Sequence, residues 1–356
     1  MFALSSSFGF GGHDVSLVLG GPSTTKWGRS NGYRRRPNSR QRQREAIMAR
    51  VLFITGFNRS GTTLVTSAVT QAARARTLTV GDLARHMPSV QRFLAAASRH
   101  GTVTDRGVDR LPVSESTPEE YGWLLNAVTG DFAFGTQAAQ ADVLHSLVDE
   151  LAGAGHATVV LKNPWDTGRE RLLLDHFAGS RVLLVRRDLS AIEDSQSRAW
   201  NRMATSNRYV RALIADPRRR AETLGAILDP LARQRVVRDA RRRMRRDAVR
   251  LARSVSKLPL DRVAFLSYDE LRADPSAGAS WAAHVLDPSA LGEAIAAHTF
   301  PEYNRASARS MTARVIDWYW ARAWRRARAR QVRAGILAVP ARSGPRAGRL
   351  ARAVRR

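Results

Sequence analysis

The segment from residue 50 to residue 72 most constrains the fold, because it joins an apolar β-rich run to a helical pattern through a turn with two glycines. The run RVLFIT is followed by GFNRSGTT (56–63) and then by LVTSAVTQA. A short apolar strand that runs into a helix is typical of a parallel sheet, and such a turn aims backbone N–H groups at one point. We therefore expect an anion-binding loop after a buried strand at 51–55.

The two glycines of this loop, Gly56 and Gly61, have the spacing of a phosphate-binding P-loop, but Thr62 occupies the position of the P-loop lysine. That lysine reaches the β- and γ-phosphates of a nucleoside triphosphate, so its replacement disfavours ATP hydrolysis and kinase chemistry. Arg59 lies inside the loop instead, and its guanidinium group can hold a phosphate and a neighbouring oxyanion together. A glycine-rich turn with an incidental arginine is the alternative interpretation.

The rest of the chain alternates short β-rich runs with longer helical patterns, which predicts an α/β fold with a P-loop-like parallel sheet flanked by helices. Further strands are expected at 158–161, 181–185 and 262–266. Helices are expected near 62–74, 89–99, 118–128, 138–153, 169–177 and 188–200. An arginine-rich insert over 207–257 is expected to form one or two long helices, and a basic C-terminal helix is expected over 313–334.

The composition divides the chain into three parts. Residues 1–47 are rich in Gly, Ser, Arg and Asn without a sustained period, so we expect a disordered basic extension, and translation could start at Met48. Residues 48–310 are expected to form the folded domain, and 311–356 a basic helical tail that is disordered after about 340. The chain has no cysteine, which excludes disulfides and thiol chemistry. It shows neither a secretory signal nor a membrane span, and we expect a cytoplasmic protein.

The formal net charge of +27 is concentrated near the ends and in the arginine-rich insert, so the predicted catalytic region is not polycationic. We therefore expect no specific nucleic-acid partner. The segment 313–334 places Trp318, Trp320 and Trp324 among arginines. It could lie on an anionic membrane surface, or its tryptophans could pack on the domain while its arginines stay solvated.

The loop GFNRSGTT resembles the 5′-phosphosulfate-binding loop of sulfotransferases that use 3′-phosphoadenosine 5′-phosphosulfate (PAPS). The bacterial and tyrosylprotein branches of that family read R-S-G-T-T, and Arg59 stands where the cytosolic aryl branch has lysine. A second family element is an arginine at a strand end followed eight residues later by a serine. Arg187 and Ser195 have this spacing after the predicted strand 181–185. The segments LKNPW (161–165) and SYDELRADP (267–275) also resemble family motifs.

The resemblance implies roles for particular residues. The loop residues Asn58, Arg59, Ser60, Gly61, Thr62 and Thr63 would bind the 5′-phosphosulfate of PAPS. Arg187 and Ser195 would bind its 3′-phosphate, Tyr268 would lie by the adenine, and Arg305 would come from a late loop over the cofactor. Lys162 is a second candidate cation at the sulfate. It is one of only three lysines in the chain, which suggests a point-charge role.

The acceptor hydroxyl needs a general base. In many relatives this is a glutamate in a Gly-Glu context, and here Gly81 is followed by Asp82, with His86 four residues on. Asp82 could instead cap the helix that follows it. Glu119, Glu120 and His145 are further candidates, and the helix containing Glu119 and Glu120 could be capped by Thr117. No metal site is expected, because the chain lacks cysteine and an H-x-x-x-H pair.

These features predict a sulfotransferase that moves the sulfuryl group of PAPS to an acceptor hydroxyl by in-line displacement. The acceptor could be a glycan, a peptide, a lipid or a small metabolite. Two other readings stay open: a non-catalytic basic protein that binds membranes or nucleic acid on a P-loop-like fold, and a P-loop kinase with a displaced lysine.

Overall fold

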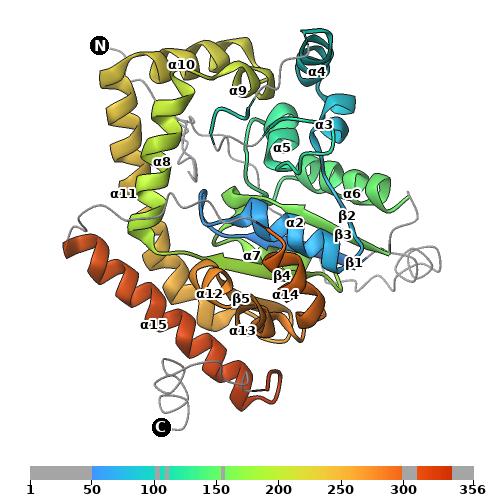
Figure 1. Ribbon diagram of the computed structural model, residues 1–356, viewed down its shortest axis with the longest axis vertical. Coiled ribbons are helices and arrows are strands. Elements are labelled where there is room, and N and C mark those ends of the chain that lie inside the picture. Colours follow the sequence, from blue (N-terminus) through green and yellow to red (C-terminus); the bar gives the residue numbers. More distant parts are fainter. Residues whose placement is uncertain (1–49, 101–104, 109–111, 154–156, 299–310, 339–356) are drawn as a thin grey trace, which may run out of the picture.

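A computed structural model describes residues 50–100, 105–108, 112–153, 157–298 and 311–338 of the chain. Its centre is a five-stranded parallel sheet (Figure 1) in the order β2-β3-β1-β4-β5. The strands are β1 (Arg50–Thr55), β2 (Arg76–Thr77), β3 (Thr158–Lys162), β4 (Arg181–Arg186) and β5 (Val263–Ser267). All four strands expected from the sequence are present within one residue, and the α/β prediction is confirmed. The two-residue strand β2 was not predicted, because it is too short to carry an alternating pattern.

The register of the sheet places the functional segments along one edge. β1 lies between β3 and β4, with Ile54 opposite Lys162 and Thr55 opposite Leu184. The loop that follows β1, the end of β3 and the residues after β4 are therefore neighbours. Ligands of open parallel α/β sheets bind at this carboxyl edge.

The strands are buried on both faces, as their continuous apolar sequence requires. On one face Leu52 and Ile54 pack with helix α2 (Thr62–Ala72) and with residues of α12 (Tyr268–Ala273), α13 (Pro275–Ala279) and α14 (Pro288–Ala296). On the other face Val51 and Phe53 pack with the remaining core helices. Among those core helices are α5 (Gly122–Thr129), α6 (Ala138–Ala152), α7 (Glu170–His176), α8 (Leu189–Met203), α11 (Pro230–Ser254) and α15 (Met311–Arg333).

The arginine-rich insert is three helices rather than one or two. They are α9 (Arg208–Leu213), α10 (Pro217–Leu228) and α11, and Figure 1 shows α11 standing beside α8 at the border of the molecule. Pro217 and Pro230 occupy the first helical positions of α10 and α11. Asp216 and Asp229 accept backbone N–H bonds as N-caps, which explains the two breaks.

The helix expected over 118–128 is shorter than predicted. Its regular part begins only at Gly122, and Thr117 does not cap it. Pro118 forms an isolated bridge with Thr79, and Glu120 forms one with Lys162. The residues before α5 therefore run as an extended segment beside the sheet, a pairing that a local helical pattern cannot reveal.

Helix α15 covers the edge strand β5 with two buried polar side chains. The Nε and Nη2 groups of Arg328 donate to the carbonyl of Phe265 at 2.8 and 2.6 Å, and Nη1 donates to Glu270 at 2.6 Å. Gln331 donates to the carbonyl of Val263 at 2.6 Å. β5 is an edge strand of the described sheet, so its outward carbonyls have no strand partner there, and these side chains supply the donors instead. Trp320 and Trp324 are also buried here, as one interpretation of the sequence expected, whereas Trp318 is exposed.

No helix in the described part of the chain combines the length and the apolar character that a bilayer span needs. The predicted N-terminal extension 1–47, the alternative start Met48 and the tail after residue 340 lie outside the described residues.

Replacement of Arg328 tests the role of α15. Arg328→Met removes three buried donors and leaves the Phe265 carbonyl without them, so we expect a loss of about 2–3 kcal/mol in the free energy of unfolding. Urea unfolding measures this. Arg325→Met, at an exposed position of the same helix, is the matched control and should change stability by less than about 0.5 kcal/mol. Equal stabilities of the two variants would contradict the role.

Candidate functional site

The loop after β1 has a backbone that tolerates few other residues at its glycines. Gly56 has φ 141°, and a Cβ there would lie 2.4 Å from the carbonyl oxygen of Val185. Gly61 has φ 95°, and its Cβ would lie 2.2 Å from the ring of Tyr268. Both positions require glycine for conformation and for space. Arg59 also has a positive φ, 75°, which is uncommon for a residue with a side chain. Such backbone strain clusters at functional sites.

Residues from three segments that are far apart in the sequence meet at this loop. Arg59 donates from Nε to the Ser195 hydroxyl at 3.1 Å. Arg187 donates from Nη1 to the backbone carbonyl of Arg59 at 2.8 Å. The Arg187 guanidinium also lies over the ring of Tyr268, 4.8 Å from its centroid. Burial lowers the pKa of Arg187, with Tyr268 and Asp269 acting in the opposite direction. A bound anion would stabilise this buried cation.

The same loop presents polar groups that suit an anion. Helix α2 begins at Thr62, and neither a side-chain cap nor an acidic residue in its first turn neutralises its N-terminus. The Nδ2 group of Asn58 and the hydroxyl of Ser60 are buried and have no hydrogen-bond partner within the described residues. Buried polar atoms of this kind are usually satisfied by a ligand, an ion or water. The loop is therefore built to receive an oxyanion.

Lys162 lies beside the loop in a buried row of polar groups. Its Nζ donates to the Thr63 hydroxyl at 3.0 Å and lies 3.2 Å from Oε1 of Glu120. Lys162 is fully buried at the end of β3, and Glu120 comes from the extended segment before α5. Burial raises the pKa of Glu120, and Lys162 lowers it. Lys162 therefore contacts the first turn of α2, and the carboxylate of Glu120 contacts Lys162.

The buried carboxyl group of Glu170 supports the segment where β1 ends and the loop begins. Glu170 accepts from the Thr55 hydroxyl at 3.1 Å and from the backbone N–H of Gly168. The N–H of Gly56 donates to the hydroxyl of Thr167 at 3.0 Å. Burial raises the pKa of Glu170 to about 7. Thr55 at the end of β1 is thus bound to the carboxyl group of Glu170. Gly56 at the start of the loop is bound to Thr167.

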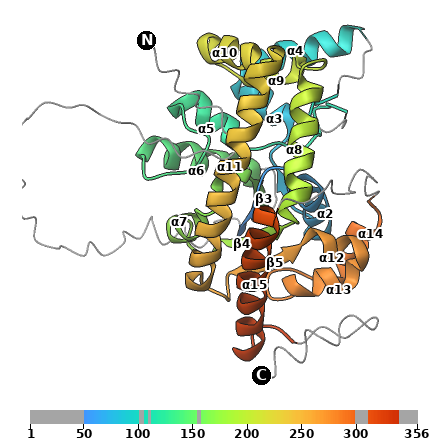
Figure 2. The same cartoon turned by 90° about the vertical axis from the view of Figure 1, so that its left-hand side faces the viewer.

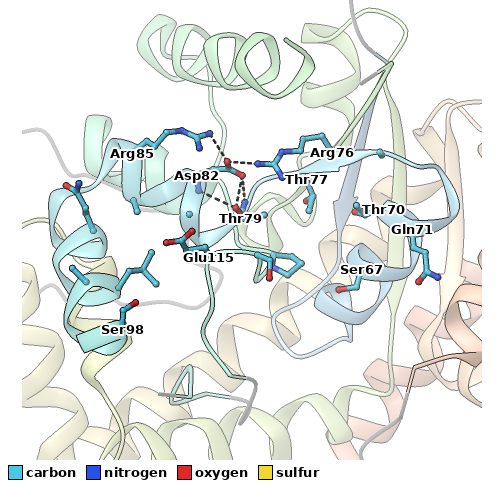
Figure 3. A pocket seen from close by; sticks show the side chains of 18 residues that line it. Ser67, Thr70, Gln71, Arg76, Thr77, Thr79, Asp82, Arg85, Ser98 and Glu115 are labelled. Atoms are coloured by element: carbon cyan, nitrogen blue, oxygen red, sulfur yellow. Dashed lines mark hydrogen bonds and ion pairs between the residues drawn. The ribbon is translucent and has the colours of Figure 1, made fainter. Parts of the chain in front are cut away.

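Asp82 and His86 lie away from the loop contacts described above. Figure 3 shows the Asp82 carboxylate between Arg76 and Arg85, at 2.8 and 2.6 Å. It also accepts from the backbone N–H and the hydroxyl of Thr79. The N-cap of α3 (Val80–His86) is Thr79 rather than Asp82, and the two form a capping box. The alternative that Asp82 is the N-cap of this helix was wrong, because Thr79 is the N-cap and Asp82 is the third residue of the helix.

His86 is half exposed and lies 2.9 Å from Glu150, a surface residue of α6. Glu119 and His145, two of the other base candidates, also contact other side chains. Glu119 is fully buried, pairs with Arg106 at 3.1 Å and accepts from the Tyr209 hydroxyl at 2.7 Å. His145 lies in an aromatic cluster with His176 and Phe177, and burial lowers its pKa. Arg305, like its neighbour Arg309, lies outside the described residues.

A cavity of about 910 Å³ opens between α2 and the pair α3 and α4 (Pro88–His100). Figure 3 shows Ser67, Thr70 and Gln71 of α2 on one side of it and Asp82 with Arg85 on the other. The lining also includes Thr77 and Pro118. The hydroxyls of Thr70 and Thr77 are buried without a hydrogen-bond partner in the described structure. We call this cavity the α2–α3 groove.

Two residues that line the groove lie close in sequence to residues at the loop. Ser67 lies one helical turn after Thr63, to whose carbonyl its hydroxyl donates at 3.2 Å. Pro118 lies two residues before Glu120, which contacts Lys162. Sequence reasoning did not find this groove, because its walls come from segments that show no shared motif. The described residues contain no group of three potential metal ligands.

Comparisons with known proteins identify the class of protein. The model of the sulfotransferase family matches residues 52–281, more than half of the chain. The chain therefore belongs to the sulfotransferase family and is a transferase. Among solved structures, it is similar to sulfotransferase STF9 from Mycobacterium avium, with 17% identity over 84% of this chain and 80% of that chain and a TM-score of 0.50.

It is also similar to sulfotransferase STF1 from Mycobacterium tuberculosis H37Rv, with 17% identity, 79% of each chain covered and a TM-score of 0.46. The likeness to STF9 supports the sulfotransferase fold. A comparison with curated proteins finds no match.

The buried carboxyl group below the loop predicts a pH dependence of stability. Glu170 has a folded pKa of about 7 against an ordinary value of 4.5. The unfolded chain therefore ionises first as the pH rises, and stability falls between about pH 4.5 and 7.5. Between these pH values the free energy of unfolding of Glu170→Gln should fall by about 3 kcal/mol less than that of the wild type. Urea unfolding at several pH values measures the difference, and parallel curves would contradict the assignment.

Proposed function

We propose that the protein transfers the sulfuryl group of PAPS to an acceptor hydroxyl. The observation that carries this proposal is the convergence of Arg59, Ser195 and Arg187 at the uncapped N-terminus of α2. An ordinary mononucleotide would place one phosphate group at such a loop, whereas PAPS carries two anionic groups, a 5′-phosphosulfate and a separate 3′-phosphate. Two arginines at the carboxyl edge of adjacent strands suit a donor with two anionic groups.

The residues divide between the two anionic groups. The loop from Asn58 to Thr63 would hold the 5′-phosphosulfate with backbone N–H groups, with Arg59, and with the unpartnered Nδ2 of Asn58 and hydroxyl of Ser60. Arg187 and Ser195 would hold the 3′-phosphate. Tyr268, whose ring supports both Gly61 and Arg187, is expected to remain close to the adenine.

The chemistry required of these residues is mostly electrostatic. In the in-line displacement the acceptor oxygen forms a bond to sulfur while the bond from sulfur to the bridging oxygen breaks. The electron pair of that bond stays on the 5′-phosphate. Arg59 and Lys162 would stabilise the negative charge that grows on the bridging oxygen. The acceptor proton moves to a carboxylate of the protein.

Glu120 is the carboxylate that the geometry favours as general base. It lies 3.2 Å from Lys162, which in turn contacts Thr63. Burial raises its pKa, which makes its carboxylate a stronger base than an exposed one. Asp82, the base suggested by the family resemblance, accepts hydrogen bonds from Thr79 and pairs with two arginines. Those contacts engage both of its carboxylate oxygens, Oδ1 with the arginines and Oδ2 with Thr79.

The α2–α3 groove is the proposed acceptor site. It adjoins Thr63 through Ser67, and it adjoins Glu120 through Pro118. Its hydroxyl and amide groups, among them the unpartnered Thr70 and Thr77, suit an acceptor that offers several hydrogen-bonding groups. The carboxylates of Asp82 and Glu115 offset Arg76 and Arg85 in its lining, which favours an uncharged acceptor. A glycan or another hydroxyl-rich metabolite meets both conditions.

Binding of adenosine 3′,5′-bisphosphate tests the donor site. Calorimetry should give tight binding to the wild type, and Arg187→Ala and Ser195→Ala should each weaken it by about 10- to 100-fold, since each removes a hydrogen bond to a charged group. Arg59→Ala should abolish transfer of ³⁵S from labelled PAPS to a cell-extract fraction. Arg171→Ala, on the exposed face of α7, is the control and should behave like the wild type.

The competing functions give different results in the same measurement. A kinase would bind ATP with Mg²⁺ in preference to the bisphosphate. A protein without a nucleotide site would bind neither, and either result would contradict the proposal.

The base assignment is tested by two conservative variants. Glu120→Gln should lower the rate of sulfate transfer by about 10²- to 10⁴-fold with binding of the bisphosphate retained. Asp82→Asn should lower the rate much less. The acidic limb of the pH–rate profile should also disappear in Glu120→Gln only. If Asp82→Asn shows the large loss and Glu120→Gln does not, the base is Asp82.

A further inference from the structure

The exposed large hydrophobic side chains of the described residues are not scattered. Six of the seven lie at two places, and only Val128 lies elsewhere. Leu228 and Leu231 are 57% and 64% exposed at the corner between α10 and α11. Met311, Val315, Trp318 and Tyr319 are exposed in the first half of α15. Clusters of this kind on a folded domain mark contact surfaces more often than isolated exposed residues do.

The exposed side chains of α15 form one face of the helix. Met311, Val315 and Trp318 are spaced by four and three residues, so they follow one another along one side. The opposite side buries Trp320 and Trp324 in the core. The helix is therefore apolar on two sides. The side with Trp320 and Trp324 packs on the domain, and the side with Met311, Val315 and Trp318 is exposed.

A continuous stripe of arginines runs along α11 from the leucine corner. Its exposed residues follow Leu231 at spacings of three or four and are Arg235, Arg238, Arg242, Arg246, Arg250 and Arg253. The stripe is about 27 Å long at the rise of an α-helix. Two carboxylates compensate it in part: Asp239 lies 3.8 Å from Arg242, and Asp247 lies 3.5 Å from Arg250.

The helices that carry the stripe and both apolar clusters lie on one side of the molecule (Figures 1 and 2). Helices α11 and α15 pack against each other. Figure 2 shows both at the front of the side turned to the viewer, with the α10–α11 corner at the top, and Figure 1 shows the same helices along one border. We call this surface, made of the arginine stripe and the two apolar clusters, the α11–α15 face.

We propose that the α11–α15 face docks the protein onto an anionic lipid surface. The arginine stripe is complementary in charge to anionic headgroups, and each arginine near such a surface strengthens binding. The leucines at one end and Trp318 with its neighbours at the other would enter the headgroup region, where aromatic side chains are favoured. Nucleic acid would explain the arginines but not the exposed leucines and Met311, which gain nothing from a phosphate backbone.

The proposal is independent of the donor site, because it rests on exposed side chains of α10, α11 and α15 and not on the loop residues assigned above. Sedimentation of the full chain with vesicles tests it. The wild type should bind vesicles of 30% phosphatidylserine and 70% phosphatidylcholine at least tenfold more tightly than vesicles of phosphatidylcholine alone. The variant R238E/R242E/R246E should lose at least tenfold of this binding. R92E/R99E/R171E, with the same change of charge on α4 and α7, should retain it.

The apolar part of the proposal has its own variant. L231S/W318S should weaken vesicle binding severalfold, and most clearly at 0.5 M salt, where electrostatic attraction is screened. Melting temperatures of all variants, and their binding of adenosine 3′,5′-bisphosphate, show that the fold is intact. Equal losses in the two triple variants would overturn the proposal, as would vesicle binding that persists in R238E/R242E/R246E. Full binding by L231S/W318S, or preference of the wild type for a 20-base-pair DNA duplex over anionic vesicles, would overturn a lipid partner.

Discussion

The hydrogen bond from Arg187 to the carbonyl of Arg59 is the contact on which the site depends, because it joins the ends of two neighbouring strands. Arg59 has a positive φ, and this contact, together with the bond from Arg59 to Ser195, holds it there. The parallel register of β1 against β4 makes the bond possible, since both strands end at the same edge. A site built in this way is positioned by the sheet rather than by the loop alone.

Burial has opposite consequences for the charged groups around that contact. It lowers the pKa of Arg187 and raises those of Glu120 and Glu170. The buried cation favours an anionic ligand, whereas the buried carboxyl groups favour protonation. The same low-polarity surroundings thus favour an anionic ligand at one part of the edge and a protonated carboxyl group at another.

Much of the fold followed from local patterns. The strands were predictable because each is a short apolar run, and the helices because their apolar residues recur every three or four positions. Binding roles for Arg59, Arg187 and Ser195 were predicted only through resemblance to a family, and the contacts of Arg59 with the other two were not predicted. Two features could not be found in this way. The bridge of Glu120 to Lys162 pairs segments that are about forty residues apart, and the α2–α3 groove has walls from separate elements.

The sequence by itself determined the class of fold and the form of the loop, because glycine spacing and an apolar strand act over a few residues. Only the tertiary structure decided which carboxylate lies beside Lys162. Asp82 and Glu120 look equivalent as acidic residues, but a capping box and two arginines engage the first, while the second lies beside Lys162. It also decided which tryptophans are buried, since that depends on how α15 lies against β5 and not on their spacing.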